Sequence, residues 1–320
     1  MSRLSRFPIY GFLGLGLIAF GWPLSWLRPA WLYPLTRHAF LFLWVGYILT
    51  VDAIVYARKG TSLWRRSRTR FLGLFAASAP AWWLFEFFNL YLRNWEYLGP
   101  REWSGFASFL VATVNFTVVT PAILETAELW GSARWVQQLG PGPRLSDSPR
   151  ALTNMILLGV MAVVAVITAP RYAFPLVWIS VYLITDPINY LRGRSSLIAF
   201  LRKGDWRPVM ALWLAGLTCG FFWELWNYYA WPKWIYHVPF VGVFHLFEMP
   251  ALGYGGYLPF AMEVYALYHL TLDLVGISAK DYVRLIDEVP LEWPRGKIQA
   301  RSFGESTQTA SKSDPPSAQI

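Results

Sequence analysis

The chain has 320 residues, of which 55% are hydrophobic and 15% are charged, and its formal net charge is +9. A soluble domain carries about 25% charged residues, and apolar runs of about 20 residues recur here, so the composition excludes an ordinary soluble protein. We attribute the excess positive charge to Lys and Arg gathered on one side of a membrane, and we expect no nucleic-acid partner.

The apolar runs, taken in chain order, predict an all-α polytopic membrane protein with eight spans. The first run follows Arg3 and Arg6 as in a signal peptide, but no small-residue cleavage site comes after it, so we expect an uncleaved span. The last run is too long for one straight crossing, and Pro250, Gly253 and Pro259 predict a bend or a break in it. The spans are expected near residues 9–27, 38–57, 71–92, 104–130, 152–169, 173–191, 207–230 and 243–275.

The distribution of Lys and Arg predicts the topology. Most of them fall in alternate connections, with groups between Arg58 and Arg70 and between Arg192 and Arg207. By the positive-inside rule, this predicts cytoplasmic termini and a place in the inner (cytoplasmic) membrane of a cell. Residues 277–320 turn polar and predict a cytoplasmic tail that is partly disordered.

Polar residues inside the spans reveal an internal duplication. Asp52–Leu63 aligns with Asp186–Leu197 through identical Asp, Ile, Tyr, Arg, Ser and Leu residues. Because membrane spans rarely contain acids and amides, their matching order predicts two parallel four-helix repeats, 1–140 and 141–276, around an axis along the membrane normal. The further pairs are Glu86 with Glu224, Asn89 with Asn227, Trp95 with Trp234, Tyr97 with Tyr236, and Glu125 with Glu263.

The rise of a helix per residue places these acids in two layers. The outer layer holds Glu86 and Glu224, each with an Asn three residues later on the same helix face. A carboxyl group removed from water favours its uncharged form and can donate or accept a proton, so these two are candidate catalytic acids. The alternative is a structural network in which Asn and Tyr staple helices through a Glu. The inner layer holds Asp52, Asp186, Glu125 and Glu263, of which the two Asp are more typical of interfacial anchors.

No metal or cofactor is expected. His245 and Glu248 are three residues apart and could share a helix face, but two ligands are too few for a typical site. The sequence contains no Gly-rich nucleotide loop, nucleophile elbow or Cys-x-x-Cys motif. The single cysteine, Cys219, excludes an intrachain disulfide, and the oligomeric state stays open.

Two tandem units, each with an intramembrane acid, then Trp-x-Tyr, then Pro followed by Glu, resemble the membrane-bound lycopene cyclase family of bacteria, archaea and fungi. The resemblance covers Glu86–Glu125 and Glu224–Glu263. In that family, two similar multi-span units form a non-redox cyclase whose acids are thought to protonate the terminal double bond of a polyene. The resemblance implies that Glu125 and Glu263 handle the proton. The family has three-span units and a Pro-x-Glu-Glu motif, whereas this chain has Pro-x-x-x-Glu and four expected spans in each unit.

Three functions fit these features. The first is a cofactor-independent acid–base enzyme, an isomerase or intramolecular lyase, acting on a carotenoid, an isoprenoid or another apolar lipid. Aromatic faces beside the acids would stabilise a carbocation, and a dry pocket would delay its capture by water. The alternatives are a proton-coupled membrane transporter and a non-catalytic scaffold or assembly factor. An enzyme predicts an aromatic cavity open sideways to lipid, a transporter predicts a path for water, and a scaffold predicts fully hydrogen-bonded acids without a cavity.

Overall fold

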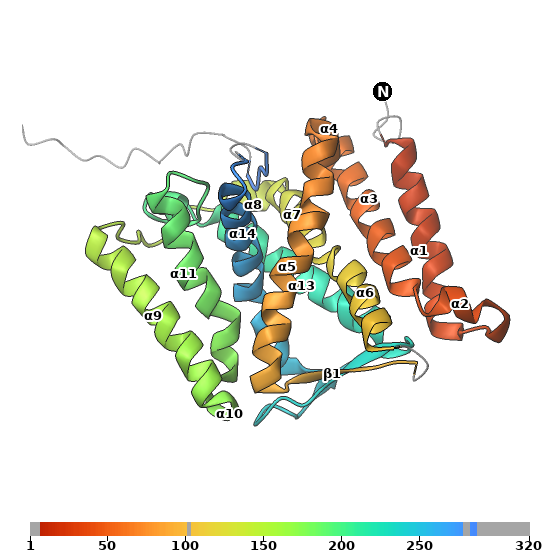
Figure 1. Cartoon of the computed structure of the whole chain (residues 1–320). Coiled ribbons are helices and arrows are strands. Elements are labelled where there is room, and N and C mark those ends of the chain that lie inside the picture. Colours follow the sequence, from red (N-terminus) through yellow and green to blue (C-terminus); the bar gives the residue numbers. More distant parts are fainter. Residues whose placement is uncertain (1–6, 101–103, 278–281, 287–320) are drawn as a thin grey trace, which may run out of the picture. The chain divides into compact units, whose positions relative to one another are not determined.

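The computed structural model describes residues 7–100, 104–277 and 282–286, and most of these residues are helical (Figure 1). The long helices are α1 (Ile9–Leu27), α3 (Ala39–Lys59), α5 (Arg68–Leu92), α6 (Gly105–Phe116), α7 (Val119–Gly131), α9 (Pro149–Thr168), α11 (Val177–Leu191), α13 (Arg207–Tyr228) and α14 (Tyr257–Leu274). The connections contain the short helices α2 (Tyr33–Thr36), α4 (Leu63–Arg66), α8 (Arg134–Gln137), α10 (Pro170–Ala173) and α12 (Ile198–Leu201). They also contain the 3-10 turns η2 (Ala30–Leu32), η3 (Phe174–Leu176) and η4 (Ala251–Gly256).

In the part of the chain that the structure describes, four short strands form two antiparallel pairs. Strand β1 (Trp95–Leu98) pairs with β2 (Lys233–Tyr236), and β3 (His245–Leu246) pairs with β4 (Met249–Pro250). The β1–β2 pair, here called the ribbon, lies at one end of the long helices, and α4 lies at the opposite end (Figure 1). We call these the ribbon end and the α4 end.

Among the described helices, four have a serine N-cap. The serine hydroxyl oxygen accepts a hydrogen bond from a backbone N–H of the first turn that has no partner inside the helix. At the other terminus of α3, Gly60 adopts φ 73°, a left-handed conformation that glycine reaches without strain. The four N-caps are Ser62 before α4, Ser67 before α5, Ser104 before α6 and Ser148 before α9.

Six helical segments in the described part of the chain are long and apolar enough to cross a membrane. By length and composition they make the chain an integral membrane protein. Helix α9 exposes a stripe of large apolar side chains that would be unfavourable in water and suits lipid: Leu157, Leu158, Val160, Met161 and Val164. The six segments are Ile9–Leu27, Ala39–Lys59, Arg68–Leu92, Gly105–Gly131, Pro149–Thr168 and Arg207–Tyr228.

The expected spans near 173–191 and 243–275 are not among these six. Helix α11 has only 15 residues, and α14 carries Glu263, His269 and Asp273, which lower its hydropathy. The expected long bent helix becomes α-helical only at Tyr257, because residues 245–256 form β3, β4 and η4 instead. The run expected near 104–130 is divided into α6 and α7 at Thr117–Val118.

Contacts between helices bring distant parts of the chain together. Helix α7 packs along α13, and α14 packs against both α11 and α13. Their contact surfaces are apolar and fully buried at Ala122, Ile123, Leu212 and Ala215. The expected disordered tail falls largely on residues 287–320, outside the described residues. Tyr282 and Leu285, which the sequence placed in that tail, are buried against this core.

Helices α1 and α3 lie side by side at very close range (Figure 1). A Cβ atom built on Gly14 would lie 2.7 Å from the Gly46 carbonyl oxygen, and one built on Gly46 would lie 2.7 Å from the Gly14 carbonyl oxygen. Small residues allow this approach, as in other packed membrane helices. Gly16, on the other side of α1, has nothing within 4 Å of a built Cβ atom.

We therefore expect Gly14→Ala to lower the free energy of unfolding by about 1–3 kcal/mol, because the added methyl group meets backbone that cannot yield. Gly16→Ala adds the same methyl group on the exposed face and should not destabilise the protein. Thermal unfolding of both variants in detergent measures the difference. Equal melting temperatures for the two variants would contradict the close contact.

Candidate functional site

The ribbon joins the two Trp-x-Tyr motifs of the sequence. Trp95 is paired with Tyr236, and Tyr97 is paired with Trp234. The His237 N–H extends the pairing by donating to the Asn94 carbonyl oxygen over 2.7 Å. The two motifs that the sequence predicted to be equivalent therefore lie side by side, with each tryptophan opposite the tyrosine of the other motif.

Asn89 and Asn227 hold the two strands of the ribbon in the same way. The Asn89 amide nitrogen donates to the Trp95 carbonyl oxygen over 2.8 Å, and its carbonyl oxygen accepts from the Trp95 N–H over 3.3 Å. Asn227 makes the matching bonds to Trp234, over 2.8 Å to the carbonyl oxygen and 2.9 Å from the N–H. Both amides therefore position the strands of the ribbon.

Glu86, in α5, is surrounded by aromatic hydrogen-bond donors. Its Oε1 accepts from the Trp82 Nε1–H over 2.8 Å, the Trp95 Nε1–H over 3.1 Å and the Tyr97 hydroxyl over 2.6 Å. Trp82 lies one helical turn before Glu86, so the two share a helix face. Three donors on one oxygen hold the carboxyl group in a fixed orientation.

Glu224, in α13, is fully buried and has a similar environment. Its Oε1 accepts from the hydroxyls of Tyr236 over 2.6 Å and Tyr257 over 2.7 Å, and Trp234 donates to the Tyr236 oxygen over 2.8 Å. Among the described residues, Oε2 of Glu224 has no hydrogen-bond partner. Burial and the adjacent Glu224 carboxylate raise the pKa of Tyr236, so this phenol stays protonated and donates.

A cavity of about 760 Å³ lies between these two clusters. Tyr97, Tyr236 and Tyr257 line it, and each donates its hydroxyl hydrogen to one of the two carboxyl groups. In the described part of the chain, the lining includes neither Glu86 nor Glu224, so the tyrosines stand between the acids and the space. Seven tryptophans of the described residues form much of the wall: Trp82, Trp95, Trp178, Trp223, Trp226, Trp231 and Trp234.

This cavity suits an apolar ligand. Its volume lies in the range of small-molecule sites, about 300–1,000 Å³, and its wall combines rings with a few polar groups. The polar groups include Asn94, Asn115 and Asn227. The two carboxyl clusters therefore share one aromatic space, although the acids reach it only through their tyrosine partners.

Asp52 and Asp186 occupy equivalent positions elsewhere and bind backbone. Asp52 accepts from the Trp64 N–H over 2.9 Å, and Asp186 accepts from the N–H groups of Leu197 and Ile198 over 2.8 Å and 2.9 Å. Each aspartate thereby fixes the short helix that follows its long helix, α4 or α12. Neither lines the cavity, and their contacts are those of structural residues.

Glu125 and Glu263, the other two candidate catalytic acids, are buried among the helices and do not line the cavity. Glu125 is fully buried, and in the described part of the chain neither of its carboxyl oxygens has a hydrogen-bond partner. Glu263 accepts from the N–H groups of Val181 over 2.9 Å and Tyr182 over 3.3 Å. The structure thus brings Glu86 and Glu224 to the aromatic space through tyrosines but does not bring Glu125 or Glu263 there.

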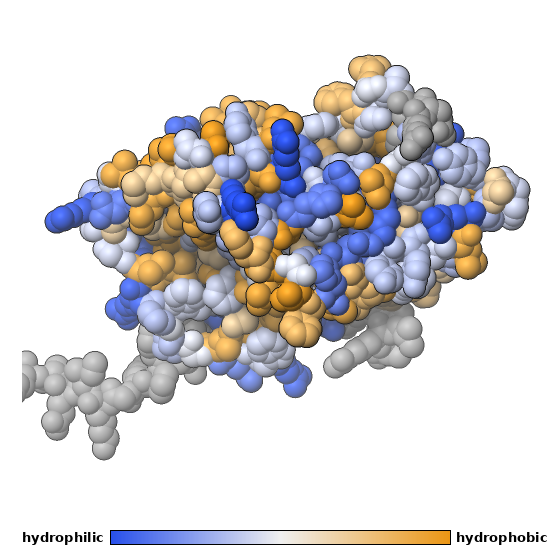
Figure 2. Space-filling view, turned by 90° about the horizontal axis from the view of Figure 1, so that it is seen from below, coloured by the Kyte–Doolittle hydropathy of each residue, from blue (hydrophilic) through white to orange (hydrophobic). Residues whose placement is uncertain are grey.

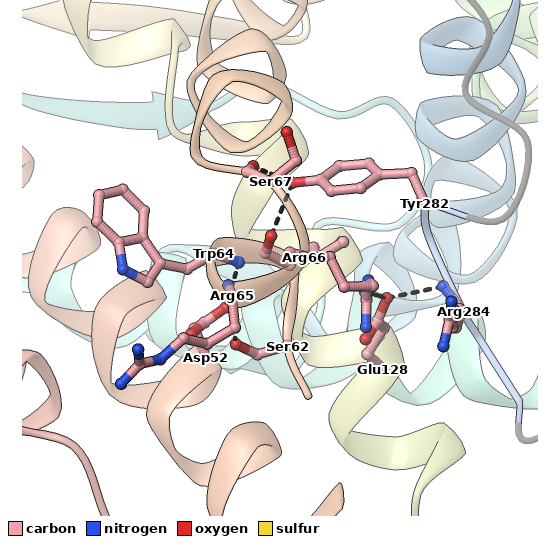
Figure 3. A network of polar contacts seen from close by, with 10 residues as sticks. Asp52, Ser62, Trp64, Arg65, Arg66, Ser67, Glu128, Tyr282 and Arg284 are labelled. Atoms are coloured by element: carbon pink, nitrogen blue, oxygen red, sulfur yellow. Dashed lines mark hydrogen bonds and ion pairs between the residues drawn. The ribbon is translucent and has the colours of Figure 1, made fainter. Parts of the chain in front are cut away.

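A separate polar network ties the C-terminal segment to the α4 end (Figure 3). Glu128, in α7, is fully buried; it forms an ion pair with Arg66 and accepts from the Arg284 N–H over 2.7 Å. The Tyr282 hydroxyl donates to the Leu63 carbonyl oxygen over 3.1 Å. These bonds involve backbone and a compensated charge pair, so the network has a structural role.

The described residues contain no group of three or more His, Cys, Asp or Glu side chains that could hold a metal ion. Glu248 forms an ion pair with Lys233, which also donates to the Tyr228 carbonyl oxygen over 2.9 Å. His245 and Glu248 therefore do not share a helix face, because His245 lies in β3 and Glu248 lies in the turn between β3 and β4.

Sequence reasoning missed Trp82, Tyr257 and the wall residues Trp178, Trp223 and Trp226. Trp82 had a usable signal, because a residue four positions before Glu86 lies on the same helix face. Tyr257 had none, because its bond to Glu224 joins residues from two different helices.

Comparison with family models, with curated proteins and with solved structures found no match for this chain.

Proposed function

We propose that this protein is a cofactor-independent acid–base enzyme that isomerises an apolar, isoprenoid-like lipid in the aromatic cavity. One observation carries the proposal: two carboxyl–tyrosine clusters, Glu86–Tyr97 and Glu224–Tyr236–Tyr257, face one space walled by indole rings. The predicted resemblance to membrane-bound lycopene cyclases agrees with this chemistry.

The proposed reaction begins when one cluster delivers a proton to a terminal carbon–carbon double bond. The phenol hydrogen adds to the alkene, and the carboxyl group behind that phenol restores its proton. The cation that forms is stabilised by indole faces and closes a ring by attack of a second double bond. The other cluster then accepts a proton from the adjacent carbon, so the product has the composition of the substrate.

In this scheme the tyrosines touch the substrate, whereas Glu86 and Glu224 supply and receive protons through them. This changes the role expected from sequence, in which the glutamates acted directly. Oε2 of Glu224 has no hydrogen-bond partner among the described residues, so this oxygen can carry the proton that the carboxyl group returns to a phenol. The cavity also argues against a scaffold, for which no cavity was expected.

We further propose eight crossings in two parallel repeats, with α11 and α14 added to the six span-length segments. Asn89 and Asn227 make equivalent hydrogen bonds to Trp95 and Trp234, and Asp52 and Asp186 each accept from the backbone at the start of the next short helix. These two equivalences support the repeat. We place the α4 end and both termini in the cytoplasm, with the protein in the inner membrane, because basic side chains gather at that end. They include Arg58, Lys59, Arg65, Arg68, Arg70, Arg192 and Arg194.

Mass spectrometry of lipids extracted from a deletion strain of the native host tests the function. Because isomerisation preserves composition, we expect one apolar lipid to accumulate and another of the same mass but different retention to disappear. Expression of the intact chain should restore the original profile. An unchanged lipid and pigment profile in the deletion strain would refute the enzyme.

A further inference from the structure

The segment Pro239–Phe247, here called the portal segment, exposes an apolar surface at the ribbon end. It contains no Asp, Glu, Lys or Arg, and its exposed side chains include Phe240 (65% exposed), Val243 (57%) and Phe244 (86%). Seen from that end, apolar residues lie at the surface between polar ones (Figure 2). Since the chain is a membrane protein by its helices, acyl chains of lipid are the partner that suits such a surface.

The opposite side of this part of the chain forms the cavity wall. Val238 and Val241 line the cavity, followed by Met249, Leu252 and Gly253. Within the portal segment, Val241 lines the cavity whereas Phe240, Val243 and Phe244 are exposed, so the same stretch borders both the aromatic space and the outside. At this place one layer of chain separates the cavity from the surroundings.

The backbone of the portal segment is held in unusual conformations. Phe240, Phe244 and Phe247 have φ values of 65°, 52° and 59°, which bulky residues rarely adopt. Phe247 occupies the first position of the two-residue turn between β3 and β4, where glycine is usual for positive φ. Such conformations persist only where surrounding contacts enforce them, and they are concentrated at ligand clamps and switch regions.

Ring contacts and one ion pair hold the turn that contains Phe247. The Phe247 ring lies 5.7 Å from that of Phe221 and 5.6 Å from that of Tyr228, both in α13. The Lys233–Glu248 ion pair fastens the base of the β3–β4 turn to the ribbon. Removing the Phe247 ring would release both the packing and the strain.

Phe240 fixes the other side of the portal segment to α10. Its ring stacks on Tyr172 at 5.8 Å, and the Arg171 guanidinium lies 5.5 Å from its centroid. An exposed tyrosine beside an arginine is typical of a membrane interface, where the apolar parts lie in lipid and the polar ends reach water. The neighbours of Phe240 are thus of the kind found where a protein meets lipid.

We propose that the portal segment lies in the lipid leaflet at the ribbon end and is the wall through which an apolar ligand passes between the bilayer and the cavity. The passage rests on the proposed function, because it requires an apolar ligand. The position of the segment in lipid does not depend on any chemistry.

Single-cysteine labelling tests the position. Cys219 is fully buried, so a Cys219→Ala background carrying Phe244→Cys gives one reactive site for bimane. In phosphatidylcholine vesicles, we expect nitroxide-bearing lipids to quench this label as strongly as one at Leu157→Cys on the exposed face of α9, and iodide to leave it unquenched. A label at Gly140→Cys, in an exposed connection, should show the reverse. A Phe244 label that behaves like the Gly140 label would overturn the proposal.

A photoactivatable farnesol added to the vesicles tests the passage. Peptide mass spectrometry would follow its attachment to wall residues such as Trp234 and Tyr257. We expect Phe247→Gly, which relaxes the turn and removes its packing, to raise the initial labelling rate severalfold with the same final labelled residues. An unchanged rate would overturn the passage. An unaltered lipid profile in the deletion strain would instead refute the enzyme and leave the quenching result standing, so the two failures are distinguishable.

Discussion

Replacing Glu224 with glutamine should lower turnover at least about 100-fold, the lower range of effects seen for a general acid or base. Glutamine preserves the shape of the side chain and an Oε1 acceptor for the Tyr236 and Tyr257 hydroxyls, but it cannot restore a proton to them. The geometry of the cavity should therefore persist while proton transfer stops. Turnover would be measured by mass spectrometry on the lipid that accumulates in the deletion strain.

The control for this variant is Glu96→Gln, which changes an exposed carboxyl on β1 that faces His237 across 3.3 Å. It removes the same charge and should retain turnover. Thermal unfolding in detergent separates loss of chemistry from loss of fold. A Glu224→Gln protein that turns over lipid at the rate of the parent would show that the carboxyl group only staples helices.

Replacing Arg66 with alanine should lower the free energy of unfolding by about 3–5 kcal/mol, because it removes the guanidinium that forms an ion pair with a buried carboxylate. The carboxylate belongs to Glu128, which is fully buried in α7. The bond from the Arg284 N–H stays, but a single backbone donor does not replace the charge of the guanidinium. Chemical or thermal unfolding in detergent measures the change.

Arg58→Ala is the matched control, since Arg58 is exposed at the end of α3 and carries the same charge. A second variant, Arg66→Met with Glu128→Gln, removes both charges and should recover much of the lost stability. Equal melting temperatures for Arg66→Ala and Arg58→Ala would contradict the buried pair.

The sequence predicted the helical membrane class, because apolar runs of bilayer length depend only on local composition. It also selected Glu86, Asn89, Glu224 and Asn227, because polar residues inside such runs are rare. The bonds of the two asparagines to Trp95 and Trp234 follow from residues close in the chain. These parts of the site were within reach of one sequence.

The ribbon could not be predicted from the sequence, and neither could the tyrosines that separate the glutamates from the cavity. Strands β1 and β2 have four residues each, too few for an alternating pattern to indicate a strand. Tyr257 reaches Glu224 from another helix, so no spacing along the chain encodes their contact. Likewise, the residues before Tyr257 read as an apolar run, although their glycines and prolines form turns and the β3–β4 pair.

The ribbon has a consequence for the integrity of the protein. Strands β1 and β2 come from opposite halves of the chain. A fragment that ends in the connection between α8 and α9 would therefore contain only one strand of the ribbon and one of the two carboxyl clusters. Two co-expressed fragments divided there would have to associate and pair β1 with β2 before the cavity was complete. Severing the backbone at that connection would thus turn an intramolecular closure into a reassembly that depends on fragment concentration.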